Sequence, residues 1–246
     1  MHTSGSNIRL TVITVAFNAK NNIEQTILSV AEQAADGIEY LVIDGASTDG
    51  TVDILRRLEH HIDRWISEPD NGIYDAMNKG IAMAHGEWIL FLNADDYFEN
   101  SRSTQYLLSE TVTPVDIVAG QTIMKSAHSE RLFLPSKHFG LMLQLPFMHP
   151  STIVRRSVFE SCGYFDARYK LAADCDFFLR VFSRGYQFHS ITEVVTVMRD
   201  GGASQRGYFR SRVEYMKAFR HNMRDPIGAC IGFIISIALR MRAIFL

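Results

Sequence analysis

The chain contains 246 residues, of which 47% are hydrophobic and 21% charged, and it carries a formal net charge of −2. This composition predicts a single globular domain with a substantial core and excludes a disordered or fibrous protein. The three cysteines show no CxxC or Cys/His metal spacing, and their odd number disfavours a disulfide framework, so a reducing compartment is expected. Residues 1–7 are short and polar and do not resemble a signal peptide, which is consistent with a cytoplasmic location.

Charge is distributed unevenly along the chain. Residues 199–246 hold nine Lys/Arg and three Asp/Glu, a net of +6, which leaves −8 on the rest. The acidic body offers no basic groove for a phosphate backbone, so nucleic acid is not an expected partner. The body and the basic tail are therefore expected to bind different partners.

Apolar runs and helical spacings alternate through the first hundred residues. Nearly continuous apolar runs are typical of strands buried on both faces of a parallel sheet, and they alternate here with amphipathic helices. The pattern predicts an α/β domain with a largely parallel sheet and right-handed crossovers. The expected elements are a strand over 8–17, a helix over 23–35, a strand over 40–43, a loop over 44–51, a helix over 52–58, a helix over 74–84 and a strand over 88–92.

Beyond Pro114 the pattern is less regular. One broad apolar face supports a helix over 174–183, and a loop that we expect to be mobile follows at Gly201-Gly202. Short strands are expected at 116–119, 131–134, 151–154 and 194–198.

Three of the predicted strands end in acidic or amide side chains: Asn18, Asp44, and Asn93 with Asp95-Asp96. In parallel sheets ligands bind outside the carboxyl ends of the strands, so the chemistry is expected at this edge. Adjacent carboxylates call for a cation, and Mg²⁺ or Mn²⁺ commonly binds one or two carboxylates together with substrate phosphates. The alternative is an exposed loop with helix-capping acids, and Asp44 alone is also explained as a turn former before glycine.

Other phosphate and metal motifs are absent from the sequence. Ala46 occupies the third position of the loop after Asp44, where a calcium loop needs a liganding side chain. Neither GxxxxGK[ST] nor GxGxxG occurs, so a glycine nest is not expected to hold phosphates, and a metal is the natural substitute.

Four stretches together resemble glycosyltransferase family two, an inverting family with the GT-A fold, over residues 10–204. The nearest subgroup is similar to bacterial enzymes of exopolysaccharide, capsule and O-antigen synthesis, such as colanic acid glycosyltransferases. Each stretch is degenerate alone, but their order and spacing are specific. The stretches are TVITVAFNAKNNIEQTILSVAEQ, LVIDGASTDGT, DNGIYDAMNKGIAMAHGEWILFLNADD and HPSTIVRRSVFESCGYFDARYKLAADCDFFLRVFSRG.

The resemblance implies a donor site in a half spanning about 8–100. The metal would be Mn²⁺ or Mg²⁺, ligated by Asp95 and bridging the two donor phosphates. Asn93 stands where relatives often have aspartate, which implies weaker metal binding, and Met77 replaces a frequent basic residue. The implied donor contacts are Thr14, Val15 and Asn18 along the nucleoside pocket, Asp44 on a base N–H, Asn78 and Gly80 beside the donor, and Asn93 and Asp96 on the ribose or organising the loop.

The resemblance also implies an acceptor site in a half spanning about 101–204. Inverting transfer needs a base for the acceptor hydroxyl, and Asp174 matches that position, with Asp176 as a substitute and Ala173 where relatives often have glutamate. The alternative for Asp174 is a helix cap. His149 and Arg199 are candidate contacts to acceptor or phosphate, although a lone histidine is more often structural.

The predicted glycosyltransferase domain covers 1–204, and a basic and apolar helical tail covers 205–246. A helix is expected over 207–224, and the apolar run 227–239 is shorter than the roughly 20 residues needed to cross a bilayer. Flanking cations favour contact with an anionic membrane surface, whereas the rival hypotheses are an oligomerisation surface or a helix packed on the domain.

The combined prediction is transfer of a sugar from a nucleoside-diphosphate donor, expected to be UDP-linked. The acceptor would be a saccharide or a polyprenyl-diphosphate-linked sugar in cell-surface polysaccharide synthesis, at the inner face of the cell membrane. One alternative is a non-catalytic sugar-nucleotide-binding scaffold, which Asn93 and Ala173 leave open. Another is a sugar-nucleotide pyrophosphorylase, disfavoured because residues 17–22 are not a glycine-rich basic loop.

Overall fold

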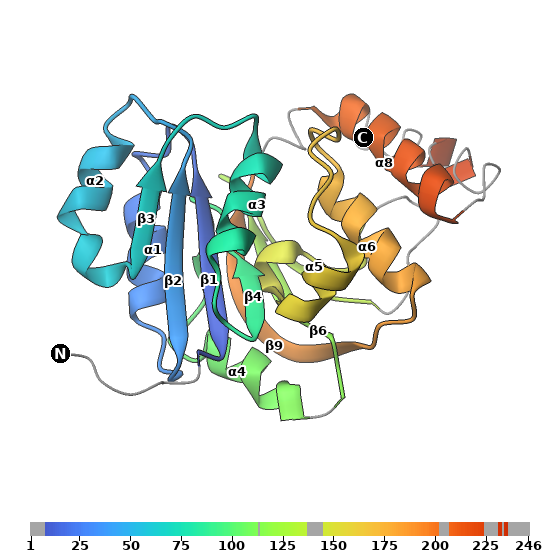
Figure 1. The fold of residues 1–246 in the computed structure, drawn as a ribbon, viewed down its shortest axis with the longest axis horizontal. Coiled ribbons are helices and arrows are strands. Elements are labelled where there is room, and N and C mark those ends of the chain that lie inside the picture. Colours follow the sequence, from blue (N-terminus) through green and yellow to red (C-terminus); the bar gives the residue numbers. More distant parts are fainter. Residues whose placement is uncertain are drawn as a thin grey trace.

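The computed structural model describes residues 8–112, 114–136, 145–201, 207–223, 231–232 and 234–235. Their elements form a mixed sheet between two groups of helices (Figure 1). In chain order these are β1 (Leu10–Ala16), α1 (Ile23–Ala31), β2 (Ile38–Asp44), α2 (Thr51–Arg57), η1 (Glu59–His61), β3 (Arg64–Ser67), α3 (Ile73–Met83), β4 (Trp88–Phe91), β5 (Tyr97–Phe98), α4 (Ser103–Ser109), η2 (Glu110–Val112), β6 (Ile117–Lys125), β7 (Glu130–Phe133), η3 (His149–Ser151), β8 (Thr152–Arg155), α5 (Arg156–Cys162), α6 (Ala173–Ser183), β9 (Phe188–Arg199) and α8 (Tyr208–Met223).

The first half of the sheet is parallel, as the sequence predicts. Strands β3, β2, β1 and β4 lie side by side in that order, and every pairing among them is parallel. All seven residues of β1 are buried because side chains alternate between two covered faces. Val12 packs in the core under α1 and α2, whereas Ile13 packs in the core under α3. The carboxyl ends of the four strands therefore share one edge.

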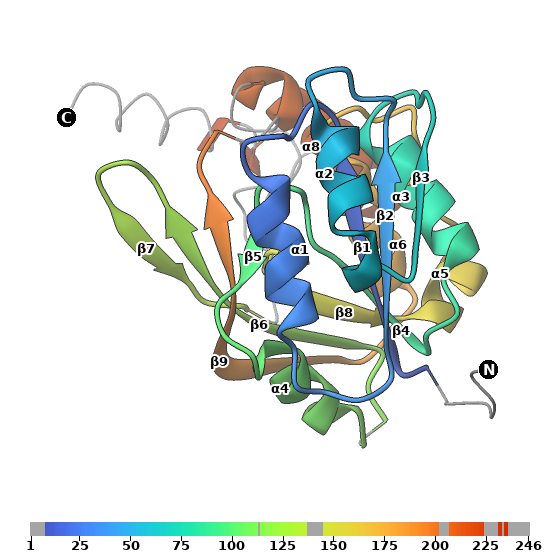
Figure 2. The same cartoon turned by 90° about the vertical axis from the view of Figure 1, so that its left-hand side faces the viewer.

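The second half of the sheet is largely antiparallel. Strand β8 pairs antiparallel with β4 and β6, while β9 runs parallel to β6 and antiparallel to β5. The β6–β7 hairpin projects from the body of the sheet (Figure 2). Strands β6 and β9 extend well beyond the expected 116–119 and 194–198, because long pairing with each other supports residues that carry no apolar run.

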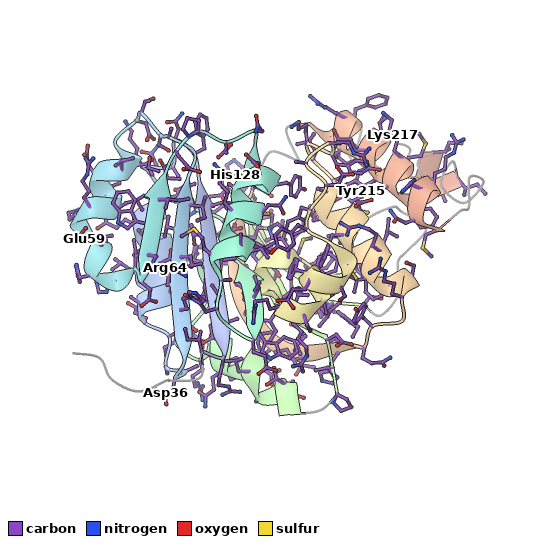
Figure 3. The ribbon with its side chains drawn as sticks, viewed as in Figure 1. Asp36, Glu59, Arg64, His128, Tyr215 and Lys217 are labelled. Carbon is purple, nitrogen blue, oxygen red and sulfur yellow. The ribbon has the colours of Figure 1, made fainter. Side chains whose placement is uncertain are left out.

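Helices α6 and α8 pack together although they lie on different sides of the predicted domain boundary. Tyr215 and Ala218 of α8 are 7% and 0% exposed and belong to the same core as α3, α5 and α6. In Figure 3 Tyr215 lies between α8 and α6, whereas the exposed Lys217 lies on the outer side of α8. Residues 208–223 thus pack on the domain, while the alternatives for the apolar run at 227–239 remain predictions.

The end of the chain is described only in part. Of the apolar run at 227–239, the structure describes four residues, and among them Ile231 and Ile234 are 46% and 65% exposed. Gly202 of the loop expected to be mobile lies outside the described residues. In the ranges that the structure describes, no helix is both long enough and apolar enough to cross a membrane.

Candidate active site

Asn18 joins the loops that follow β1 and β2. Its φ of 51° is left-handed, a conformation that asparagine tolerates better than most residues. The backbone N–H of Asn18 donates to Ser47 Oγ at 2.7 Å, and the side-chain Oδ1 of Asn18 accepts from the Thr48 N–H at 3.0 Å. The side chain therefore shapes the edge of the sheet, and its predicted contact with the nucleoside remains a prediction.

Asp44 lies at the end of β2 and is fully buried. Its Oδ2 accepts from the Ser47 N–H at 2.9 Å and from Ser67 Oγ at 2.6 Å, and its Oδ1 accepts from Ser47 Oγ. In this conformation the carboxylate organises the β2–α2 loop rather than facing solvent. A contact with a base N–H, as predicted, requires the loop around Ser47 to move.

The side chains of Thr14 and Val15 lie inside the sheet, and the predicted place of these residues along the nucleoside pocket remains a prediction. Thr14 is 0% exposed and accepts a hydrogen bond from Tyr40 Oη at 3.1 Å, and Val15 is 6% exposed. Helices cover both faces of β1, so neither side chain reaches a ligand in this conformation. Phe17, at the same strand end, is 67% exposed and was not among the predicted site residues. In the sequence, the signal for Phe17 is an aromatic residue directly after a buried strand.

Asn78 and Gly80 of α3 have structural roles in this conformation. The Asn78 amide exchanges two hydrogen bonds with the backbone of Phe165, at 2.9 and 3.0 Å, and so ties α3 to the segment before α6. A Cβ at Gly80 would lie 2.5 Å from Cγ2 of Ile13, so glycine permits the close crossing of α3 over β1. The predicted contacts of these two residues with the donor remain predictions.

Asp96 holds the acidic loop together from inside. It is 1% exposed, its Oδ2 accepts from Asn93 Nδ2 at 3.2 Å, and its Oδ1 accepts from the Arg199 N–H at 3.2 Å. Burial and the neighbouring Asp95 carboxylate raise the pKa of Asp96 well above its usual range. Of the two roles expected for Asp96, organising the loop is the one this geometry supports.

Arg199, at the end of β9, lies against the same loop. Its Nη1 donates to the Asp95 backbone carbonyl at 2.8 Å, its Nη2 donates to Gln25, and its guanidinium stacks over the Tyr97 ring at 5.1 Å. The cation is therefore beside the place where donor phosphates are expected. It fixes the backbone of the loop at the same time.

The Asp95 side chain fits a metal held jointly with substrate. It lies in the turn after β4 and is partly exposed, whereas Asn93 beside it has a buried Oδ1 that accepts no hydrogen bond. Among the described residues, no group of three His, Cys, Asp or Glu side chains is placed to hold a metal alone. A single carboxylate completed by phosphates and water is a usual environment for Mg²⁺ and Mn²⁺, so Asp95 would hold the ion through donor phosphates.

Asp174 lies in the first turn of α6, with its side chain 15% exposed. Its Oδ1 accepts from Tyr74 Oη and from the Cys175 N–H, each at 2.9 Å, and its Oδ2 lies 4.0 Å from His149 Nδ1. The three side chains line one cavity. Its other lining residues are mostly apolar: Ile73, Met77, Phe91, Thr152, Val154, Phe159, Phe165 and Phe178.

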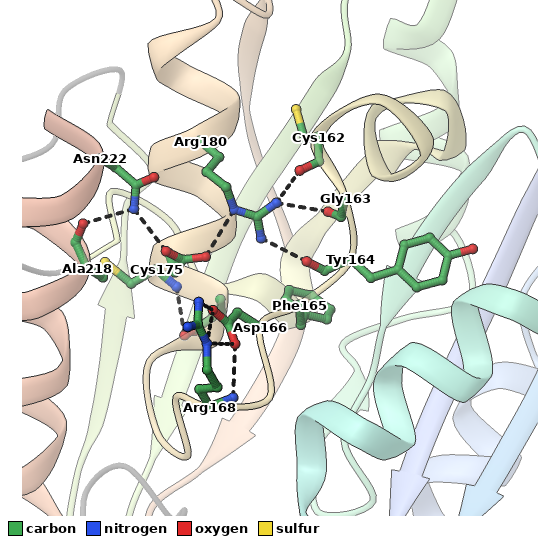
Figure 4. Close-up of polar contacts among 12 residues, drawn as sticks. Cys162, Gly163, Tyr164, Phe165, Asp166, Arg168, Cys175, Arg180, Ala218 and Asn222 are labelled. Atoms are coloured by element: carbon green, nitrogen blue, oxygen red, sulfur yellow. Dashed lines mark hydrogen bonds and ion pairs between the residues drawn. The ribbon is translucent and has the colours of Figure 1, made fainter.

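Asp176 lies outside this cavity, although it was predicted as a substitute for Asp174. Residues two apart on a helix point to different sides, and the Asp176 carboxylate faces α8. Its Oδ2 accepts from Arg180 Nε at 3.0 Å and its Oδ1 accepts from Asn222 Nδ2 at 2.9 Å (Figure 4). Arg180 also donates to the backbone carbonyls of Gly163 and Tyr164, so this buried network ties α6 to α8 and to the segment after α5.

The acidic loop and Asp174 meet through His149. Asn93 Nδ2 lies 3.1 Å from His149 Nε2, and the other ring nitrogen faces Asp174. The sequence profile of glycosyl transferase family 2 matches residues 11–185, which is well over half of the chain. The chain belongs to glycosyl transferase family 2. The residues predicted from that resemblance on the metal loop and at the base position thus occupy one site.

Curated relatives of this family 2 chain are named as biosynthetic glycosyltransferases. The chain is 34% identical to a PGL/p-HBAD biosynthesis glycosyltransferase of Mycobacterium bovis over 151 residues, 58% of this chain and 57% of that protein. It is 36% identical over 102 residues, 40% of each chain, to TuaG of Bacillus subtilis, a putative teichuronic acid biosynthesis glycosyltransferase. The match therefore spans little more than half of the length of the first relative.

Solved structures show the GT-A fold for the family 2 chain. TarS of S. aureus, solved with UDP-GlcNAc, superposes with a TM-score of 0.67 at 16% identity, over 93% of this chain and 71% of that one. The mannosyltransferase PcManGT of Pyrobaculum calidifontis, solved with GDP-Man and Mn²⁺, gives 0.70 at 20% identity, over 92% and 68%. The predicted α/β GT-A fold is confirmed.

Proposed function

We propose that this protein transfers a sugar from a nucleoside-diphosphate donor to a hydroxyl acceptor with inversion, in the synthesis of a cell-surface polysaccharide. One observation carries the proposal. The Asp95-Asp96 loop, which suits a diphosphate, and the Asp174 carboxylate, which suits a hydroxyl, face one site and are bridged by Asn93 and His149. Single displacement needs these two opposite functions on either side of one anomeric carbon.

In the proposed reaction the acceptor oxygen bonds to the anomeric carbon while the bond from that carbon to the donor phosphate oxygen breaks. Asp174 accepts the acceptor's proton, and the nucleoside diphosphate leaves with the bonding electron pair. Arg199 lies beside the acidic loop, where its charge stabilises the departing diphosphate. A divalent metal bound at Asp95 would supply further charge stabilisation for that leaving group.

The nucleoside is proposed to bind at the carboxyl edge of β1 and β2, with its base on Phe17. The exposed ring offers a face for stacking, next to the loops that Asn18 joins. UDP is the proposed nucleoside on the family resemblance. TarS, which was solved with UDP-GlcNAc, is consistent with it, whereas GDP-Man in PcManGT makes GDP the alternative.

The acceptor is proposed to be a saccharide or a polyprenyl-diphosphate-linked sugar reached at an anionic membrane surface. Helix α8 turns Tyr215 inward and leaves Phe209, Arg210, Lys217 and Arg220 exposed. An outer face with cations and an exposed aromatic suits shallow contact with anionic headgroups. Peripheral binding at the cytoplasmic side of the membrane follows from this proposal.

The donor is identified by thermal unfolding with a panel of UDP- and GDP-sugars in the presence of Mn²⁺ or Mg²⁺. A ligand that binds the folded state at 100 times its Kd stabilises it by about 2.7 kcal/mol. We expect one nucleotide sugar to raise the Tm and to release its nucleoside diphosphate when acceptor extract is added. Binding with no turnover under any metal would favour the non-catalytic scaffold instead, and pyrophosphate-dependent formation of nucleoside triphosphate would favour the pyrophosphorylase.

The same assay tests the metal loop. Asp95→Ala is expected to abolish metal-dependent release of nucleoside diphosphate, because the described site offers no second carboxylate with the same exposure at that turn. Asp53→Ala, an exposed acid on α2, is the control and should leave release unchanged. Full metal-dependent release by Asp95→Ala would remove the proposed metal contact.

A further inference from the structure

Four side chains from four separate segments form a chain of contacts across the site. Tyr74 of α3 donates to Asp174 of α6, and His149 of η3 faces the other carboxylate oxygen at 4.0 Å. Asn93, after β4, reaches the far side of the His149 ring at 3.1 Å. The sequence predicts neither the contact of Tyr74 with Asp174 nor the link from Asn93 to Asp174 through His149, because these residues lie up to 100 positions apart.

Asn93 determines which ring nitrogen of His149 carries the proton. Its Nδ2 also donates to Asp96 at 3.2 Å, which orients the amide so that N–H groups face the imidazole. An amide NH₂ only donates, so His149 Nε2 must accept, and the neutral ring then carries its proton on Nδ1, toward Asp174. Burial lowers the pKa of His149, which keeps the ring neutral, although the nearby Asp174 and Asp95 charges oppose this effect.

We propose that Tyr74 and His149 are positioning residues that hold the Asp174 carboxylate in one orientation, and that Asn93 sets the tautomer in which His149 faces that carboxylate. The inference rests on the sugar-transfer function proposed above. It also gives a reason for asparagine at position 93. An aspartate there offers no N–H to Nε2. Nε2 would then carry the proton, and the unprotonated Nδ1 of the neutral ring would face Asp174.

Other titratable groups around Asp174 define the background against which the proposal is tested. Tyr215 of α8 and Cys175 of α6 have pKa values raised first by burial and then by the Asp174 charge, so both stay neutral at ordinary pH. Burial, and then the Asp174 charge, likewise raise the pKa of Tyr74, which keeps its hydroxyl a donor. Arg212 of α8 is the cation on that side, with its guanidinium 4.3 Å from the Tyr215 ring.

The kinetic test uses Tyr74→Phe and His149→Gln with the donor selected by thermal unfolding. Each is expected to lower kcat by about tenfold or more with little change in donor KM. Tyr74→Phe removes a hydrogen bond to Asp174, and His149→Gln removes the ring that faces the other carboxylate oxygen at 4.0 Å. The two changes should combine non-additively.

Matched controls separate positioning from general destabilisation. Tyr164→Phe removes a phenol that is 40% exposed on a residue that does not line the Asp174 cavity, and His128→Gln changes an exposed histidine of the β6–β7 hairpin. Both should leave kcat and donor KM unchanged. A lower Tm in Tyr74→Phe or His149→Gln with unchanged kcat would overturn the proposal.

A second measurement needs no substrate and is independent of the proposed function. Long-range ¹H–¹⁵N NMR spectra report the tautomer of each histidine, and His149→Gln identifies the signal of His149. We expect the Nδ1–H form in the wild type and its loss in Asn93→Leu. An Nε2–H form in the wild type overturns the inference whatever the enzyme does. Lack of transfer with every donor, alongside the Nδ1–H form, would instead count against the proposed function alone.

Discussion

Three aspartates near the site have different chemistry because their surroundings differ. Asp174 accepts from neutral donors and borders a cavity, Asp96 is buried in the loop it organises, and Asp176 is neutralised by Arg180. In the sequence all three stand beside another acid or one residue from one, and nothing local tells them apart. Their roles follow from which element faces each carboxylate.

Asp174→Asn and Asp176→Asn are expected to fail in opposite ways. The first keeps the shape of the side chain but cannot accept a proton, so donor binding is retained and transfer falls by roughly 10² or more. The second removes the charge of the buried Asp176 and leaves the partly buried Arg180 without its partner, so it lowers the free energy of unfolding, by about 3 kcal/mol. Single-turnover transfer and urea unfolding of both variants measure this. Near-normal transfer by Asp174→Asn would place the base elsewhere.

Phe17→Ala tests the stacking surface at the end of β1. Stacking of a base on an aromatic side chain contributes about 1–3 kcal/mol, so donor affinity should fall by about tenfold or more. Stability should hardly change, because the ring is 67% exposed. The control is Phe209→Ala, whose ring is 64% exposed on α8. Calorimetric titration with the selected donor measures both, and equal affinities would exclude stacking on Phe17.

At the scale of elements, a buried acid joins the strands at the edge opposite the site. Glu39 of β2 is 5% exposed and accepts from Thr11 Oγ1 of β1 at 2.7 Å, from the His85 N–H at 2.8 Å and from Arg64 of β3 at 2.9 Å. Burial alone raises the pKa of Glu39, but these hydrogen bonds outweigh it and lower the pKa overall. The network clamps three parallel strands.

This network makes part of the stability depend on pH. Because the folded-state pKa of Glu39 lies below the ordinary value of 4.5, its contribution is present above that pH and is lost as the pH falls through the folded value. Glu39→Gln should cost about 1.5–3 kcal/mol at pH 7, with a smaller difference from the wild type at pH 3.5. Urea unfolding at both pH values measures it, with the exposed Glu59→Gln as control. A difference that stays constant with pH would contradict the assignment.

At the scale of the molecule, α8 lies at one end and α2 at the other (Figure 1). The exposed cations of α8 include Lys217 and Arg220, and those of α2 are Arg56 and Arg57. Each Lys or Arg near an anionic surface contributes about 1 kcal/mol, and salt screens this attraction.

Charge reversal on α8 tests the proposed membrane surface. Lys217→Glu with Arg220→Glu should weaken binding to phosphatidylserine vesicles by at least about tenfold at low salt, while leaving the Tm nearly unchanged. Arg56→Glu with Arg57→Glu on α2 is the matched control. Sedimentation with vesicles measures both pairs. Equal losses would show unspecific charge attraction, and no loss in either would exclude α8 as the contact.

Much of the donor half was predictable because its signals are local. Strands β1, β2 and β4 are visible in the sequence as apolar runs that end in acidic or amide residues. Parallel pairing then brings those strand ends to one edge of the sheet. Strand β3 gave no signal because it is a short edge strand whose residues are all at least partly exposed. Helix α5 likewise was not predicted.

The sequence alone determined the α/β class and the order of the donor-half elements, because strand periodicity is a local property of a chain. Its resemblance to the family, carried by the order of the motifs, implied Asp95 and Asp174 as the residues expected to act. Only the tertiary structure decided what each side chain faces. It placed Thr14, Asn78, Gly80 and Asp176 in structural contacts, exposed Phe17, and packed α8 on α6. It also joined Asn93 to Asp174 through His149. Hydrogen bonds between residues far apart in the chain depend on packing, and no local pattern records them.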